Sequence, residues 1–266
     1  MAHRYQTDPD SPFHKVRFRS RTNYGTFINR ILADRGDAKI ADLNADDVKQ
    51  LYAEWTKDGH FAMARGLLVM FRMLIKYGAL ELKDQESGRF YLELRGLEFS
   101  KHQSQESGND QLTPEQITAI IKMAHEMKKP SIALAQAFYS DCNELEQKDI
   151  LGEWVPKNEP GESDVTSEKD KWIRGIRWEE IDADFVLRHE TSREGKIIQI
   201  NLRGTAPRVM AEIDRMGPRI HGLQRGPVIV SEVTKRPYAY NSFRDYWRKV
   251  AEATGLPKEV RIMGTR

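Results

Sequence analysis

A polar segment near the middle of the chain divides the sequence into two parts with different hydrophobic patterns. The segment "KHQSQESGNDQ", Lys101 to Gln111, lacks apolar periodicity and contains Ser-Gly-Asn-Asp, which is typical of an interdomain linker. Before it, apolar residues recur at helical spacing, whereas later segments alternate with period two. At 266 residues, the chain is long enough for two domains that each bury a core. We therefore expect a mostly α-helical protein with a small antiparallel β-sheet.

The part before the linker predicts helices preceded by a basic segment. Residues 1–22 are expected to form an extended basic arm. The run "LNADDVKQLYAEWTKDG" predicts an amphipathic helix that begins with a capping box at Asn44. A longer, more buried helix is expected from Phe61 to Tyr77, closed by Gly78. The charged residues of this helix lie on one face and are Arg65, Arg72 and Lys76. They either bind a phosphate backbone or form the solvated face of a core helix.

The part after the linker predicts helices at both ends and strands between them. Thr113 has the residues of a capping box after it, and Ser131 is expected to cap the next helix. The runs "FVLRHE" and "KIIQINL" flank "TSREG" and predict a hairpin with Gly195 in its turn. A further short strand is expected at Arg225–Val230. The run "NSFRDYWRKVAEATG" predicts a helix capped at Asn241.

The stretch "DCNELEQKDILGEWVP", Asp141 to Pro156, carries five acidic residues and one lysine directly after a buried helix. These acids are a catalytic pair, a solvated helix end, or a phosphate site that has lost its positive charge. Carboxylates that act on a glycosidic bond face each other across a cleft, which acids along one helix end do not fit. The single cysteine, Cys142, lies beside acids that would raise its thiol pKa, so we expect a structural cysteine.

Composition excludes several classes of protein. One cysteine allows no internal disulfide and indicates a reducing compartment. The N-terminus has no apolar core of a signal peptide, and the run "LLVMFRMLI" is too short to span a bilayer, so a cytoplasmic protein without membrane contact is expected. Phosphate-binding glycine loops, a nucleophile elbow and histidine pairs at ligand spacing are all missing. We therefore expect no metal and no cofactor.

Charge is distributed unevenly along the chain. The formal net charge is only +2. Residues 141–170 carry ten acids and three lysines, whereas residues 203–266 carry thirteen Lys or Arg and six acids. A basic C-terminal third indicates either a nucleic-acid surface or a solvated face with an uneven charge count.

Taken in order, the motifs resemble those of a known family. They are "LTPEQITAIIKMA", a buried helix, "LEQKDILGEWVP", "IRWEEIDADFVLRHETSREGKIIQINL" and "GPVIVSEVTKRPYAYNSFRDYWRKVAEATGLP". This order is similar to that of the tyrosine recombinase (phage integrase) family, especially rhizobial integrase-like proteins. The resemblance implies a basic arm at 1–22, a helical core-binding (SAM-like) domain at 23–100, a linker at 101–111 and a truncated α+β catalytic domain at 112–266.

The family's chemistry predicts roles for particular positions. In the family, a tyrosine attacks a DNA phosphodiester without a metal, two arginines hold the phosphate oxygens, and a hairpin lysine protonates the leaving oxygen. The family's first arginine follows the buried helix in a pattern like L-R-x-x-[ED]-[IL]. The run "LEQKDIL" matches this pattern, so Glu146 occupies the arginine position and Asp149 keeps the acidic one. At about 4 Å and an effective dielectric near 20, this exchange replaces roughly 4 kcal/mol of attraction with similar repulsion. Lys148, on another side of the helix, is a poor substitute.

The remaining positions also depart from the family's pattern. Arg193 aligns with the hairpin lysine, and arginine is a very weak proton donor because its pKa exceeds 12. The family also has an H-x-x-R motif, whose histidine helps with proton transfer and positioning. In "RIMGTR", which matches this motif, Met263 stands at the histidine position and Arg266 at the second arginine. The family's nucleophilic tyrosine would lie beyond Arg266. Three tyrosines precede this motif and are expected to have structural roles: Tyr238, Tyr240 and Tyr246.

The resemblance therefore implies a DNA-binding protein of the recombinase type that does not cleave DNA as the chain stands. Its partner would be duplex DNA, with self-association on DNA as a further expectation. The expected DNA contacts are Arg65, Arg72, Lys76, Arg244 and Arg248. Three alternatives remain open: an active recombinase subunit whose tail is missing or supplied by another chain, a non-enzymatic DNA-binding regulator or decoy, and a decayed integrase fragment.

Overall fold

The computed structural model describes residues 1–99, 112–217, 225–258, 260 and 262. The chain forms two compact units, Met1–Glu106 and Ser107–Arg266, here called unit 1 and unit 2. The predicted linker at 101–111 lies outside the described residues. Within them, no helix is both long and apolar enough to cross a membrane, and no group of three or more His, Cys, Asp or Glu side chains is placed to hold a metal ion.

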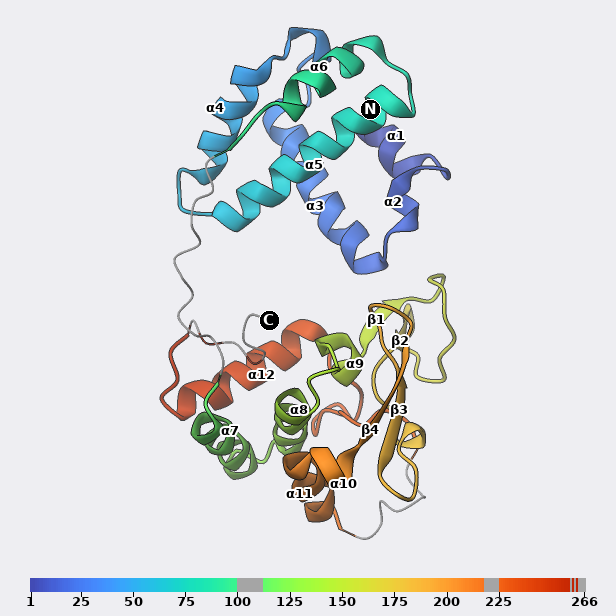
Figure 1. Cartoon of the computed structure of the whole chain (residues 1–266), viewed down its shortest axis with the longest axis vertical. Helices are drawn as coiled ribbons and strands as arrows, with labels where there is room; N and C mark the ends of the chain where they lie inside the picture. The colour runs from blue at the N-terminus through green and yellow to red at the C-terminus, as the bar shows by residue number, and fades with distance from the viewer. Residues whose placement is uncertain (100–111, 218–224, 259, 261, 263–266) are drawn as a thin grey trace. The chain divides into compact units, whose positions relative to one another are not determined.

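Unit 1 is helical and is built around α5 (Figure 1). Its helices are α1 (Ala2–Thr7), α2 (Pro12–Lys15), α3 (Phe18–Arg35), α4 (Ala45–Thr56), α5 (Phe61–Leu80) and α6 (Gln85–Arg95), with a 3-10 turn at Ile40–Asp42. Helices α1, α3, α4 and α6 all contact α5. The predicted capping box of α4 is present, because Asn44 accepts from the first-turn amides and Asp47 accepts from the Asn44 amide at 2.9 Å.

The prediction of an extended arm at residues 1–22 is wrong, because this segment forms α1, α2 and the start of α3. Tyr5 is 1% exposed and its ring meets those of Phe13 and Tyr77 edge-on, at 5.7 and 5.2 Å between centroids. Ser11 caps α2 by accepting from the Phe13 amide and donates to the Tyr5 carbonyl at 2.6 Å. Burial of these aromatic rings holds the segment against the unit despite its basic composition.

The end predicted for the long helix is also wrong, because α5 continues through Gly78 to Leu80. A side-chain carbon at position 78 would lie 2.5 Å from the Ser87 hydroxyl on α6. The glycine therefore allows two helices to approach closely and does not end one.

Unit 2 combines helices with two small antiparallel sheets, which confirms the predicted fold class. Its helices are α7 (Pro114–Glu126), α8 (Pro130–Asp141), α9 (Gln147–Leu151), α10 (Leu202–Thr205), α11 (Pro207–Arg215) and α12 (Tyr240–Ala253), with a 3-10 turn at Trp178–Glu180. One sheet pairs β1 (Glu153–Pro156) with β2 (Asp170–Ile173), and the other pairs β3 (Val186–Glu190) with β4 (Ile197–Asn201). The β3–β4 hairpin is the predicted one, and Gly195 in its turn has φ +66°.

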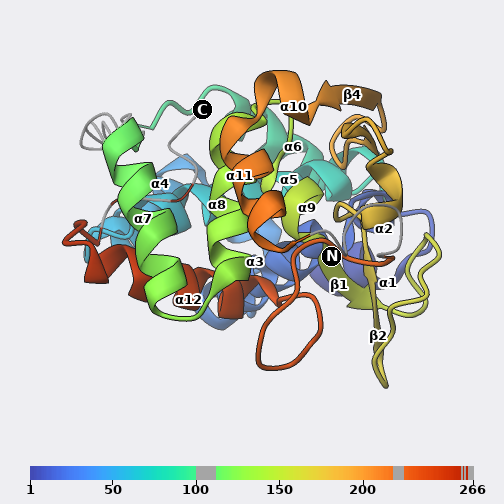
Figure 2. The same cartoon turned by 90° about the horizontal axis from the view of Figure 1, so that it is seen from below.

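The buried helix α8 is the centre of unit 2 and packs against α7, α11 and α12 (Figure 2). Its side chains from Ser131 to Tyr139 are all buried. The one amide group among them is satisfied, because Gln136 accepts from the Trp247 indole of α12 at 2.7 Å. The capping box predicted at Thr113 begins α7.

Three local predictions in unit 2 are wrong. Ser131 does not cap α8; Lys129 is the N-cap, and Glu232 accepts from the Ser131 amide at 2.7 Å in its place. Helix α12 begins one residue before Asn241, with Ala239 as its N-cap. The segment Arg225–Val230 forms only isolated bridges within the described residues.

Candidate functional site

The acidic stretch Asp141–Pro156 contains α9, and the N-terminal end of this helix contacts the β3–β4 turn. Glu146 is the N-cap of α9, and its carboxylate lies 3.3 Å from the Arg193 guanidinium. The two side chains are 43% and 74% exposed. The residue expected at a phosphate-binding position and the residue expected at the hairpin lysine position are therefore brought together, and their charges neutralise each other.

Asp149 lies beneath this pair and joins three segments of unit 2. It is fully buried, and its carboxylate accepts from the Ser192 amide at 2.5 Å and from the Glu146 amide at 2.7 Å. Its backbone carbonyl accepts from the Ile176 amide at 2.7 Å. Burial alone would raise the carboxyl pKa, but the charge of His189, whose Nε2 lies 3.6 Å away, and hydrogen bonds from the Ser192 and Glu146 amides hold that pKa below its usual value.

His189 connects Asp149 to a second carboxylate. The imidazole is 3% exposed, with Nδ1 3.0 Å from Glu180 and Nε2 3.6 Å from Asp149. Burial opposes its charged form, but the two carboxylates outweigh this effect and raise the pKa of His189 to about 9. At neutral pH a buried imidazolium therefore lies between two carboxylates and fixes the β3–β4 hairpin to α9.

Asp149, His189 and Glu180 form this network. The sequence motifs pointed to Asp149 but not to His189 or Glu180. A signal for His189 was present in the run "VLRHE". Because strand side chains alternate between faces, His189 shares the buried face of β3 with Leu187. A titratable residue at such an apolar position requires a partner.

Lys148 is committed to a different contact. Its ammonium lies 3.4 Å from Glu153 on β1, and Arg174 also pairs with Glu153. This is consistent with the expectation that Lys148 is a poor substitute for a phosphate-binding arginine at position 146.

The predicted DNA-contacting residues of unit 1 differ in their environment. Arg65 and Lys76 are exposed. Arg72 is half-buried; its guanidinium donates to the carbonyls of Leu94 and Leu97 at 3.3 and 2.8 Å and lies 5.2 Å above the Phe99 ring. Arg72 therefore joins α5 to the segment that follows α6.

The two arginines predicted on α12 also differ. Arg244 is exposed and pairs with Asp245 at 3.3 Å. Arg248 is half-buried, donates to the Pro257 carbonyl at 3.1 Å and to the Val260 carbonyl, and lies over the Trp247 ring. Met263 and Arg266, assigned to the H-x-x-R motif, lie outside the described residues.

Two other side chains considered as reactive groups are buried. Cys142 is fully buried, and burial with the nearby Asp141 and Glu144 raises the pKa of its thiol to about 12. Tyr238 is 4% exposed, its hydroxyl contacts Ser131 and Glu232, and burial raises its pKa to about 12. Both are therefore poor nucleophiles at neutral pH.

Comparison with known proteins bears on the fold. No protein family matches the sequence, and no curated protein matches it. Among solved structures, a lambda integrase dimer bound to a COC′ core site matches with a TM-score of 0.65 and 15% identity, over 96% of this chain and 77% of that chain. A lambda integrase tetramer bound to a Holliday junction matches with a TM-score of 0.63 and 16% identity, over 97% of this chain and 64% of that chain. At this identity the likeness shows that the chain has the integrase fold across nearly its full length.

Proposed function

We propose that this protein binds duplex DNA in the manner of a tyrosine recombinase and that its phosphate-binding site is electrostatically disabled. Support comes from the integrase fold, which the solved structures present on DNA core sites and on a Holliday junction. Exposed cations offered to the DNA backbone include Arg65, Lys76 and Arg244. Self-association on DNA belongs to the same proposal, because the similar integrases were solved as a dimer and a tetramer.

The contact between Glu146 and Arg193 carries the proposal. A phosphate at this position would meet a carboxylate where the family presents a guanidinium, and the neighbouring Arg193 is already paired. Because both side chains are well exposed, solvent screens the effect, and an exposed pair contributes up to about 1 kcal/mol. We therefore expect weak phosphate binding at this site rather than exclusion of DNA from the surface.

Strand cleavage would be affected more than binding. A developing negative charge on the scissile phosphate needs preorganised cations, and Glu146 adds repulsion at that point. Arg193 at the hairpin position is a poor proton donor at neutral pH, because a guanidinium holds its proton in proteins. Met263 and Arg266 are assigned to the histidine and second arginine positions as part of the same proposal.

The experiment combines binding with a test for covalent chemistry. In fluorescence anisotropy titrations of a labelled duplex, the logarithm of the affinity should fall linearly with the logarithm of the salt concentration. A nicked suicide duplex incubated with the full chain should give no protein–DNA adduct on a denaturing gel. A covalent adduct would contradict the disabled site, and absence of any salt-dependent duplex binding would contradict the DNA-binding proposal.

A non-enzymatic DNA-binding regulator is the second candidate. It is favoured by the same Glu146–Arg193 pair, which reduces phosphate affinity without removing the exposed cations elsewhere. Such a protein would compete with an active recombinase for a shared duplex, which an anisotropy competition assay measures directly.

A further inference from the structure

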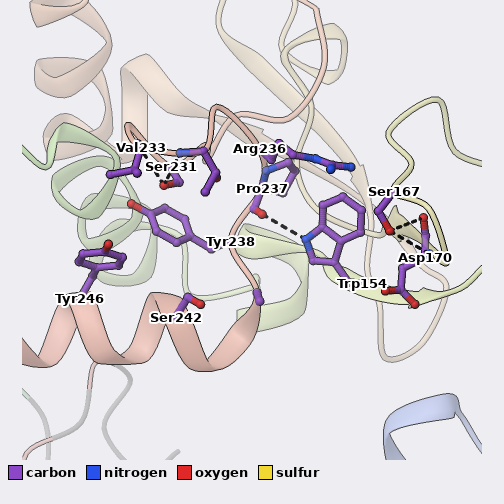
Figure 3. Close-up of a pocket in the computed structure, with 12 residues that line it drawn as sticks. Trp154, Ser167, Asp170, Ser231, Val233, Arg236, Pro237, Tyr238, Ser242 and Tyr246 are labelled. Atoms are coloured by element: carbon purple, nitrogen blue, oxygen red, sulfur yellow. Dashed lines mark hydrogen bonds between the residues drawn. The ribbon is translucent and has the colours of Figure 1, made fainter.

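Two features of unit 2 have no role in the phosphate site. One is a cavity of about 440 Å³ beside the β1–β2 hairpin (Figure 3). Two polar groups of its walls already have partners, because the Trp154 indole donates to the Pro237 carbonyl at 3.1 Å and Arg236 donates to the Thr166 carbonyl. The other feature is the outer edge of β4, where several backbone groups have no partner among the described residues.

The register of the β3–β4 pair decides which backbone groups of β4 point outward. The Thr191 amide donates to the Lys196 carbonyl at 2.8 Å, and the Leu202 amide donates to the Phe185 carbonyl at 2.9 Å. Residues of an antiparallel strand alternately face the neighbouring strand and face away from it, so the even-numbered residues from 196 to 202 bond to β3. The odd-numbered residues of β4 therefore direct their amides and carbonyls away from β3.

The outward residues are Ile197, Gln199 and Asn201, and all three are exposed. Within the part of the chain that the structure describes, the backbone groups of Ile197 and Gln199 and the Asn201 amide form no hydrogen bond, whereas the Asn201 carbonyl accepts from the Thr205 hydroxyl at 2.9 Å. The Ile197 side chain is 68% exposed, and β4 lies at the margin of unit 2 in Figure 2. An edge of this kind can accept a further strand.

The edge does not carry the residues that usually keep strands apart. Ile197–Asn201 contains no proline and no charged residue. Lys196 lies just before β4, and the charge of Arg188 on the exposed face of β3 is paired with Asp182 at 3.3 Å. Two such edges would therefore meet without like charges directly opposite each other.

We propose that the outer edge of β4 pairs with the same edge of a second copy of this chain, in an antiparallel register centred on Gln199. The two Gln199 residues then exchange a pair of backbone hydrogen bonds, and each Asn201 amide donates to the Ile197 carbonyl of the other copy. The register is self-complementary, as a two-fold contact requires, because residues 197 and 201 lie at equal distances from 199. Each exposed Ile197 side chain lies opposite Asn201 of the second copy. The contact needs no DNA and is independent of the phosphate site.

Sedimentation velocity on the full chain without DNA tests the association. A strand pair of this length buries less than a standard interface, so we expect a monomer–dimer equilibrium with a dissociation constant of about 10–100 µM. Gln199→Pro should raise this constant about tenfold or more, because proline removes the outward amide at the centre of the contact and leaves the bonds to β3 intact. A wild-type chain that stays monomeric up to about 300 µM would overturn the proposal.

A second substitution changes the edge without altering the backbone. Ile197→Lys places a charge in the contact and should also raise the dissociation constant about tenfold. Glu190→Gln, opposite Ile197 on β3, changes the net charge equally and should alter the constant by no more than about twofold. Thermal unfolding of each variant shows that it is folded. Equal dissociation constants for these two variants would overturn the assignment to the β4 edge.

Disulfide trapping tests the register. Cys142 is fully buried, so an introduced surface cysteine is the accessible thiol. In Gln199→Cys the two Cα atoms would lie about 5.5 Å apart, so mild oxidation should give a cross-linked dimer. In Ile197→Cys the two positions would be separated by four residues along the strands, roughly 13 Å, which is too far for a disulfide. No cross-link at 199, or an equally efficient one at 197, would overturn the proposed pairing, whether or not the chain binds a duplex.

Discussion

Replacing His189 with glutamine should destabilise unit 2 in a pH-dependent way. The imidazolium is 3% exposed and lies between Asp149 and Glu180. Its pKa is raised from 6.5 to about 9, a shift that corresponds to about 3 kcal/mol. Because the folded-state pKa exceeds the unfolded one, this stability is fully present below about pH 6.5 and is lost as the pH rises through about 9.

The acidic partner sets the opposite limit. The pKa of Asp149 is lowered, so its contribution is present above the usual value of 3.8 and is lost as the pH falls through its folded-state value. The network should therefore stabilise unit 2 most between these two limits. Glutamine at position 189 can donate to one carboxylate but carries no charge, so both partners lose their electrostatic compensation.

Urea unfolding followed by tryptophan fluorescence measures the effect. Most of the signal comes from unit 2, which contains Trp154, Trp172, Trp178 and Trp247. We expect His189→Gln to lower the free energy of unfolding by about 3 kcal/mol at pH 6 and by less than about 1 kcal/mol at pH 10. His60→Gln, at an exposed position of unit 1, should give no difference at either pH. A loss of equal size at both pH values for His189→Gln would refute the charged network.

Two further substitutions test structural roles. Gly152→Ala should destabilise unit 2 by about 3 kcal/mol or more in the same urea assay, because φ is +70° and the new carbon would lie 2.2 Å from the Trp172 indole nitrogen. Gly255 has φ +82° and open space around it, so Gly255→Ala should lower the free energy of unfolding by only about 1 kcal/mol. Equal losses for the two variants would contradict the close approach at Gly152. Arg72→Met should lower the stability of unit 1 by about 2 kcal/mol in circular-dichroism melts because two carbonyls lose a donor, whereas Lys76→Met should stay within about 0.5 kcal/mol. Similar effects of these two variants would contradict the structural role of Arg72.

Features that depend on neighbouring residues were predictable from the sequence. The capping boxes at Asn44 and Thr113 and the hairpin around Gly195 follow from side chains within a few positions of one another, and all three are present. These features are predictable because the side chains and backbone groups that form a helix cap or a tight turn lie within a few residues of one another.

Features that depend on distant contacts were not predictable in the same way. Tyr5 orders the first helices by packing against Tyr77, which a local reading of basic residues cannot reveal. The strands β1 and β2 are four residues each and are separated by an acidic loop, so neither shows a clear period-two pattern. His189 meets Asp149 across forty positions of sequence, and only its place on the buried face of β3 indicated a partner.

The meeting of Glu146 and Arg193 had a different origin. Residue patterns alone left the acidic stretch open between a solvated helix end and an altered phosphate site. The resemblance to recombinases placed both residues near one phosphate, and the structure brings their side chains to 3.3 Å.

The salt dependence of duplex binding by Glu146→Arg tests the disabled phosphate site most directly. Glu144→Arg is the matched control, since it reverses an exposed charge two positions away and changes the net charge equally. In anisotropy titrations, Glu146→Arg should steepen the slope of log affinity against log salt by about one relative to this control, because an arginine is introduced at the phosphate position in place of the carboxylate that pairs with Arg193. Equal slopes for the two variants would contradict the account.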